Sequence, residues 1–260
     1  MKSLGRFLIK ARVFESLASK EPERVQTDTL RWRFRLAKRE IYMKAVFLRS
    51  LVRSRITSKP AVYVLGDSHA GIFLKRKPFI VHWFGPATAY KLKSPGSTTR
   101  SNERLFHILK YIVKDRDKVL MLFGEIDCRV HIYNQYVKRD KRLPMEELID
   151  ETVASYAVVL ERMKEMGIDF YVASVPPAAR EENIFGVPNY PPPEARCLIN
   201  RVFDERLRDC CEKNGYRFID AYSKVVDAEG FIRTEFSLDD GTHLKPEAIK
   251  FFEEGLGIRK

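Results

Sequence analysis

Two short stretches far apart in the chain carry residues that could act together in nucleophilic catalysis. Ser68 lies in a Gly-Asp-Ser-His stretch (residues 66–69), and His243 lies near the other end of the chain, three residues after Asp240. A serine nucleophile needs a base to take its proton, and the base needs a partner that fixes its tautomer. We therefore expect Ser68 as nucleophile, His243 as base and Asp240 as orienting acid, with Asp239 as the alternative acid.

The elements that must position these residues are short apolar runs that alternate with helical patterns from residue 61 onward. Helical spacing of apolar residues follows Ser101, which has the character of an N-cap, and recurs over residues 148–163 and 195–213. A last helix is expected near Pro246, because proline is accepted in the first helical turn. Five apolar runs have the character of buried strands: residues 62–65, 79–84, 119–123, 170–175 and 216–219.

This alternation predicts an α/β protein, a three-layer α/β/α sandwich around a five-stranded, mainly parallel sheet. Ligands bind beyond the carboxyl ends of the strands in such folds, so the residues after each strand are the functional candidates. Ser68 follows the first expected strand, Gly85 the second and Gly124 the third. A serine on a strand-to-helix turn lies at a helix N-terminus, where backbone N–H groups and the helix dipole favour a developing oxyanion.

The order of these pieces resembles the SGNH (GDSL-type) hydrolase superfamily. A serine ends the first strand, glycines end the second and third strands, and an Asp/His pair precedes the last helix. The resemblance covers about residues 61–256 and leaves the N-terminal part unexplained. It implies a three-layer α/β/α fold and hydrolysis or transfer of acyl groups through a serine ester. That mechanism needs no cofactor and no metal, and the sequence carries no motif for either.

Carried onto this sequence residue by residue, the resemblance assigns an oxyanion hole. Ser68 matches the nucleophile of the first block, whose own backbone N–H is one donor. Gly85 matches the glycine of the second block, which donates a second N–H, while Gly96 is a competitor that lies farther from the strand end. His243 matches the base of the last block and Asp240 its orienting acid.

The third block departs from the family pattern. The family usually has Gly-x-Asn-Asp, whose asparagine completes the oxyanion hole, but here Ile126 stands at that position between Gly124 and Asp127. Isoleucine cannot donate a hydrogen bond, and loss of one such donor typically costs about 2.7–4 kcal/mol of transition-state stabilisation. The stretch Gly-Glu-Ile-Asp-Cys-Arg also resembles a subgroup of SGNH-like proteins associated with bacterial surface-polysaccharide gene clusters. Three nearby side chains could substitute as donors: Arg129, His131 and His69.

The charged residues of this block have two interpretations. Charges just past a strand end often form a salt-bridged loop. Alternatively, Arg129 binds an anionic sugar or the oxyanion and is held by Glu125 or Asp127. The substrate-binding candidates are Asp67, His69, Gly124, Glu125, Asp127, Arg129 and His131.

The net charge of +12 is concentrated in an N-terminal arm. Residues 1–60 hold 16 Lys/Arg and 5 Asp/Glu, whereas residues 61–260 hold 31 and 30. This split indicates a domain boundary near Pro60. Within the arm, residues 4–14 have helical spacing, residues 30–36 alternate apolar residues with arginine as strands do, and helical spacing resumes at Ile41. We expect a basic, largely helical arm (1–60) and an SGNH-like domain (61–260).

The arm has three possible roles: a helical cap with a solvated basic face, docking of residues 1–59 to an anionic membrane or a partner protein, or binding of nucleic acid. No recognisable nucleic-acid-binding motif accompanies the charge, which disfavours the last. The N-terminus lacks the pattern of a signal peptide, and no apolar run approaches the roughly 20 residues that span a bilayer. We expect a cytoplasmic protein, with a peripheral position at the inner membrane surface as the alternative.

Composition and motifs together leave two functions. A chain of 260 residues that is 45% hydrophobic excludes a disordered, collagen-like or disulfide-stapled protein, and its four cysteines show no metal-ligand spacing. The first function is a serine-dependent ester hydrolase or acyltransferase acting on O-acyl groups of a carbohydrate or another acylated small molecule. The second is a catalytically weak or inactive binding or assembly module in surface-glycan biosynthesis, which Ile126 favours.

Overall fold

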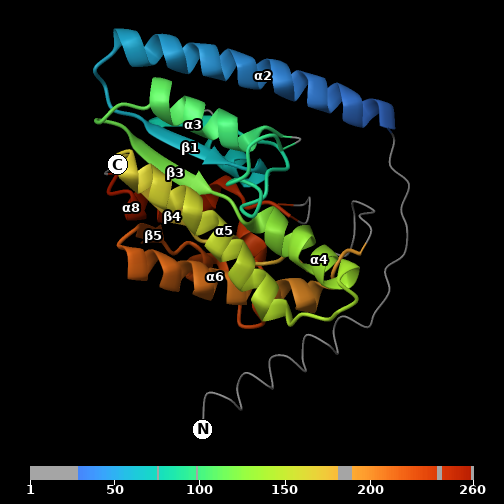
Figure 1. Ribbon diagram of the computed structural model, residues 1–260. Coiled ribbons are helices and arrows are strands. Elements are labelled where there is room, and N and C mark those ends of the chain that lie inside the picture. The colour runs from blue at the N-terminus through green and yellow to red at the C-terminus, as the bar shows by residue number, and fades with distance from the viewer. Residues whose placement is uncertain (1–28, 75, 98, 181–188, 239–241, 259–260) are drawn as a thin grey trace.

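A computed structural model describes residues 29–74, 76–97, 99–180, 189–238 and 242–258. At its centre lies a five-stranded sheet with the strand order β2-β1-β3-β4-β5, in which every neighbouring pair is parallel (Figure 1). The expected α/β architecture is thus confirmed. The strands are β1 (Val62–Gly66), β2 (Phe79–Trp83), β3 (Lys118–Leu122), β4 (Phe170–Ala173) and β5 (Arg217–Ile219).

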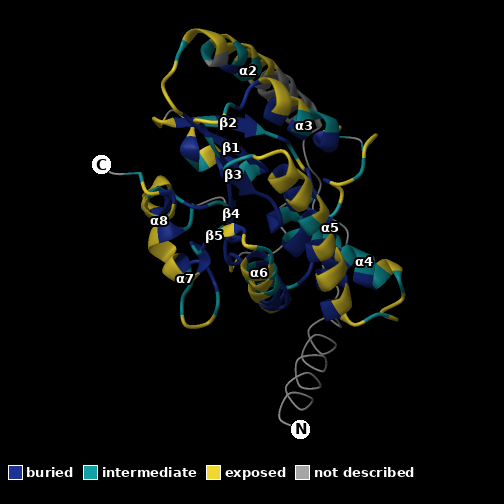
Figure 2. Cartoon of the chain, turned by 60° about the vertical axis from the view of Figure 1, so that its left-hand side comes forward, coloured by how far each residue is buried: buried dark blue, intermediate teal, exposed yellow. Residues whose placement is uncertain are grey.

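Helices cover both faces of this sheet. Alternate side chains of β1 point to opposite faces: Tyr63 and Leu65 join one apolar cluster with α3, α5 and α6, while Val62 and Val64 join a second one with α8. The central strands are therefore buried on both faces, as Figure 2 shows, which explains their continuous apolar sequence. The helices are α2 (Thr29–Ile56), α3 (Ser101–Tyr111), α4 (Ile132–Lys138), α5 (Met145–Glu165), α6 (Pro193–Asn214), α7 (Tyr222–Val225) and α8 (Ile249–Gly255).

The expected element boundaries need three corrections. Residues 30–36 are part of the long helix α2, so the prediction of a strand there was wrong; leucine and arginine are good helix formers. Ser101 is the first residue of α3 rather than its N-cap, and Arg100 precedes it in a left-handed conformation. No helix is expected between Gly124 and residue 148, but Ile132–Lys138 form helix α4. The expected helix over residues 4–14 lies outside the described residues.

Close approach between the strand ends requires glycine at two positions. A Cβ atom on Gly66 would lie 2.5 Å from the carbonyl oxygen of Leu122. Gly124 has a φ of +120°, and a Cβ atom there would lie 2.7 Å from the ring of Phe203. These two glycines let β1 and β3 end side by side, which brings the segments after them together.

Two negative findings complete the fold. In the part of the chain that the structure describes, no helix combines the length and the apolar character needed to cross a membrane. All four cysteines are free thiols, and Cys128 and Cys211 are buried.

Candidate active site

Ser68 begins the 3-10 helix Ser68–Phe73 directly beyond the carboxyl end of β1. Asp67 caps this helix, because its Oδ1 accepts a hydrogen bond of 2.9 Å from the backbone N–H of His69. Ser68 itself is half-buried, and within the described residues its hydroxyl makes no hydrogen bond. The serine is therefore held at a helix start, directly beyond the end of the first strand.

Gly85 follows β2 and has a φ of +69°. Neither its backbone N–H nor that of Ser68 has a hydrogen-bond acceptor among the described residues. The competing glycine is different, since the N–H of Gly96 donates to Glu103 Oε1 at 2.8 Å. This bond removes Gly96 as an oxyanion donor. The roles of Ser68 and Gly85 as donors stay predictions, and no described residue occupies either N–H group.

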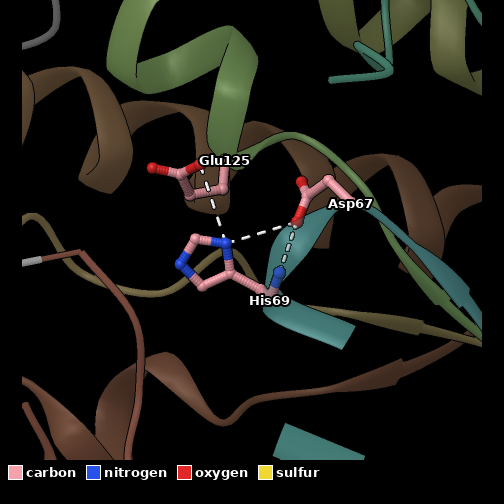
Figure 3. A group of neighbouring side chains, drawn as sticks. All are labelled: Asp67, His69 and Glu125. Carbon is pink, nitrogen blue, oxygen red and sulfur yellow. Dashed lines mark hydrogen bonds and ion pairs between the residues drawn. The ribbon is translucent and has the colours of Figure 1, made fainter. Parts of the chain in front are cut away.

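His69 lies at the centre of a buried polar cluster (Figure 3). Its Nε2 is 2.9 Å from the carbonyl oxygen of Thr242, which can only accept, so Nε2 carries a hydrogen. Its Nδ1 is 3.2 Å from Asp67 Oδ1 and 3.7 Å from Glu125 Oε2. Burial opposes protonation of His69, but the carboxylates of Glu125 and Asp67 outweigh it and raise its pKa to about 9. His69 is therefore an imidazolium with both ring N–H groups occupied.

The same cluster has the composition of a metal-binding group. Asp67, His69 and Glu125 each offer one ligand atom, and these atoms lie within 4.8 Å of one another. A metal ion would replace the proton on Nδ1. Because that proton already bonds Asp67 Oδ1 and the protonated ring is also ion-paired with Glu125, we interpret the cluster as an ion-paired group.

Glu125 and Arg129 form the salt-bridged part of the third block. Arg129 Nε lies 2.6 Å from Glu125 Oε1, and Arg129 also forms a hydrogen bond with the side chain of Tyr190. Burial would raise the pKa of Glu125, but Arg129 and His69 hold it below its usual value. Glu125 thus connects the His69 cluster to a half-buried guanidinium.

Asp127 supports the neighbouring loop. Its carboxylate is fully buried and accepts hydrogen bonds from the backbone N–H groups of Ala89 (2.6 Å) and Tyr90 (3.2 Å). Burial raises its pKa to about 7. These two bonds fix the segment that follows Gly85, so we interpret Asp127 as a positioning residue. His131 packs against Tyr90, and burial together with Lys91 lowers its pKa to about 4.

The third block also contains an unusual backbone feature. Residues Asp127–His131 form a π-helical turn, in which the N–H of Ile132 bonds the carbonyl oxygen of Asp127. Such turns are rare and occur frequently at functional sites. Ile126, the half-buried residue just before this turn, has no polar side-chain atom to contribute. No pattern in the sequence distinguishes this turn from an ordinary helix start.

The C-terminal motif meets the first block at His69. The ring centroid of His243 lies 4.7 Å from that of His69, with the planes tilted by 33°. Because Ser68 directly precedes His69, the two stretches that are far apart in sequence lie side by side in the structure. Asp239 and Asp240 lie outside the described residues, so the structure does not place the orienting acid.

A polar pocket beside the cluster contains residues that sequence reasoning missed. Arg196 and Asn200 of α6 line it together with Arg129 and Thr242, and both α6 residues are buried. Asn200 Nδ2 donates to the carbonyl oxygen of Pro176 at 2.7 Å. The available signal was a buried polar stripe on α6 with a spacing of four residues: Arg196, Asn200 and Asp204.

Solved structures share this architecture. No protein-family profile matches the sequence, and no curated protein matches it either. A GDSL-like lipase from Bacteroides thetaiotaomicron is 15% identical with a TM-score of 0.56, over 83% of this chain and 95% of that one. A "putative acylhydrolase" from Bacteroides fragilis is 18% identical with a TM-score of 0.53, over 81% and 93%. The fold is that of the SGNH hydrolases. The resemblance in the sequence is thus confirmed for the fold, and the SGNH-like order of strands and turns places Ser68 and His243 at one end of the sheet.

Proposed function

We propose that this protein is a serine-dependent ester hydrolase or acyltransferase that acts on O-acyl groups of a carbohydrate. The observation that carries the proposal is the meeting of the Ser68 turn and His243 beyond the carboxyl ends of the strands. The SGNH fold of lipases and acylhydrolases supports the general chemistry.

The reaction would run through an acyl-enzyme. Ser68 Oγ attacks the ester carbonyl carbon while His243 takes its proton, and the leaving alcohol then receives that proton. The negative charge on the tetrahedral intermediate is held by the backbone N–H groups of Ser68 and Gly85. Water or a sugar hydroxyl, deprotonated by His243, then attacks the acyl carbon; the bond to Ser68 Oγ breaks, and His243 returns the proton to Ser68. The Ser68 hydroxyl must turn to His243 in the substrate complex, which is common because such hydrogen bonds often tighten only on binding.

The site lacks the side-chain oxyanion donor that the SGNH pattern places at residue 126. Both ring N–H groups of His69 are occupied, and Arg129 is engaged by Glu125 and Tyr190. Ile126 adds no side-chain donor, and His131 is the remaining candidate of the three; without it, the two backbone N–H groups stabilise the oxyanion alone. Loss of one donor corresponds to about 10²–10³-fold in kcat, so we propose a slow enzyme.

The same observation favours a second function. A chain that keeps the SGNH fold without a full oxyanion hole could serve as a binding or assembly module in surface-glycan biosynthesis. In that case the polar pocket lined by Arg129, Arg196 and Asn200 would bind a glycan without cleaving it.

Covalent labelling separates the two functions. A fluorophosphonate probe reacts with an activated serine, so the wild-type protein should be labelled one-to-one and Ser68→Ala should not. Ser94→Ala, a change at a half-buried serine outside the proposed catalytic residues, is the matched control and should keep full labelling. Folding of each variant is checked by circular dichroism. Absence of labelling in the folded wild-type protein would overturn the enzymatic proposal and favour the module.

The carbohydrate part of the proposal has its own assay. Acetate release from O-acetylated sugars and from an aryl acetate should both depend on Ser68. A higher kcat/KM on the acetylated sugars supports a carbohydrate substrate, whereas activity on the aryl acetate alone would leave an esterase for a different alcohol.

A further inference from the structure

The outer face of α2 carries large apolar side chains in contact with solvent. Ile41, Leu48 and Ile56 are 70%, 61% and 79% exposed, and Val52 and Tyr42 are exposed as well. Five of the nine exposed large hydrophobic side chains among the described residues lie on this one helix. This concentration indicates a surface with a function.

The apolar residues form one stripe. At about 100° per residue, Ile41, Leu48, Val52 and Ile56 fall within a sector of roughly 80°. On the same wheel, Lys44 and Arg55 lie along one border of the stripe and Arg49 along the other. All three cations are exposed. No Asp or Glu occurs between residues 41 and 66. The face is therefore an apolar stripe with positive borders, which we call the α2 stripe (Ile41, Leu48, Val52 and Ile56).

The opposite face of α2 holds the helix on the domain. Phe47 and Leu51 pack against the main apolar cluster, and the Phe47 ring lies 5.5 Å from that of His107 and 6.4 Å from that of His82. Ser50, which lies between these two residues in the sequence, is also buried, and its hydroxyl donates a hydrogen bond of 2.7 Å to the carbonyl oxygen of Val46. Because this face is anchored, the α2 stripe points away from the domain, along the outer edge seen in Figure 1.

We propose that the α2 stripe docks this protein on the surface of an anionic membrane. Apolar side chains would enter the headgroup region while the bordering cations pair with anionic lipids, the arrangement of interfacial amphipathic helices. The inference is independent of the proposed catalytic function.

Charge argues against two other occupants. In a two-fold dimer formed through the stripe, the cationic borders of one copy would face those of the other. Nucleic acid would bring phosphates against the centre of the face, which is apolar, whereas the cations lie only at its borders. An anionic lipid surface offers an apolar region for the stripe and negative charges for the cations at its borders.

Vesicle sedimentation at physiological salt tests this docking. The full-length protein should partition strongly to phosphatidylcholine vesicles that contain phosphatidylglycerol and weakly to phosphatidylcholine alone. Leu48→Asp/Val52→Asp should lower the partition coefficient at least tenfold. Arg49→Gln/Arg55→Gln should lower it roughly thirtyfold on the basis of about 1 kcal/mol for each basic residue. The matched control is Val158→Asp, which makes the same change at an exposed site on α5 and should bind like the wild type.

Three outcomes would overturn the proposal. One is binding that the aspartate variants leave intact. Another is loss of binding when residues 1–28 are deleted while α2 is intact, which would assign the membrane contact to that segment. The third is a dimer in sedimentation velocity that Leu48→Asp/Val52→Asp dissociates, which would make the stripe an interface between two copies. Circular dichroism and thermal melting confirm that each variant is folded.

Discussion

At the scale of single residues, the site depends on a histidine that is held as a buried cation. His69 donates to a backbone carbonyl from one side of its ring and faces two carboxylates from the other. Such a group changes how stability depends on pH, because its pKa differs between the folded and unfolded chain.

We expect the His69 cation to stabilise the protein in acid and neutral solution. Its pKa is about 9 when folded and about 6.5 when unfolded. The stabilisation is therefore complete below about pH 6.5 and is lost as the pH rises through 9, by up to about 3 kcal/mol. Urea unfolding at pH 6.5 and 9.5 should show this loss in the wild type and not in His69→Gln. His107→Gln changes an exposed histidine on α3 and should behave like the wild type. An equal change in unfolding free energy between the two pH values in all three proteins would contradict the prediction.

The missing oxyanion donor makes a second prediction at this scale. Ile126→Asn should restore the side-chain amide of the family pattern and raise kcat on an aryl acetate by up to about 10²-fold, since one donor is worth that much. KM should change little. Ile126→Val, which adds no donor, is the control. An unchanged kcat in folded Ile126→Asn would mean that the oxyanion lies elsewhere.

At the scale of elements, the ends of β1 and β3 determine where the reactive side chains lie. Gly124→Ala should destabilise the protein by about 2–4 kcal/mol, because the backbone is left-handed and the added Cβ meets Phe203 and Val175. Gly71→Ala is the matched control, since its Cβ would meet no atom within 4 Å and its φ is not left-handed. Thermal melting of both variants measures the difference, and similar melting temperatures would show that the strand ends can move apart.

An element could be predicted where its apolar residues form a buried run or recur with the spacing of a helix. The five strands are short apolar runs, and each was placed within one or two residues of its observed ends. The alternation of apolar residues with arginine over residues 30–36 was misleading, because a period of two specifies a strand only when another strand edge is available for pairing. The polar stripe of α6 was missed because its partners, such as the carbonyl oxygen of Pro176, belong to a distant loop.

The candidate site was predictable in its motifs and not in its contacts. Ser68 follows from its place after the first strand, and His243 follows from its place before the last helix. The pairing of His69 with the carbonyl oxygen of Thr242 joins residues 173 positions apart, which no local pattern encodes. The buried role of Asp127 likewise depends on the backbone N–H groups of Ala89 and Tyr90.

At the scale of the whole molecule, α2 belongs to the basic arm and also packs against the folded domain. Phe47 and Leu51 reach the main apolar cluster, so the change in charge near Pro60 does not coincide with the first packed residue. The domain boundary at residue 60 stays a prediction, and two truncations test it.

Deletion of residues 1–40 should leave the melting temperature within about 3 °C of the wild type, because Phe47 and Leu51 remain. Deletion of residues 1–60 should lower it by roughly 6–12 °C. Losing these two side chains costs on the order of 3 kcal/mol, at about 2–4 °C for each kcal/mol in a domain of this size. Differential scanning calorimetry measures both. Equal melting temperatures for the two truncations would show that α2 contributes nothing to the folded body.

The direction of α2 has a consequence for how substrates would arrive. The helix runs alongside the sheet, and the strands point toward the same side of the molecule as the N-terminal end of α2 (Figure 1). In a protein that rests on a bilayer through α2, the carboxyl ends of the strands would point roughly along the plane of the membrane, and Ser68 lies just beyond one of them. Encounters between the site and its substrate would then take place in two dimensions. Glycans carried on lipids in the same leaflet would meet the site far more often than glycans free in solution.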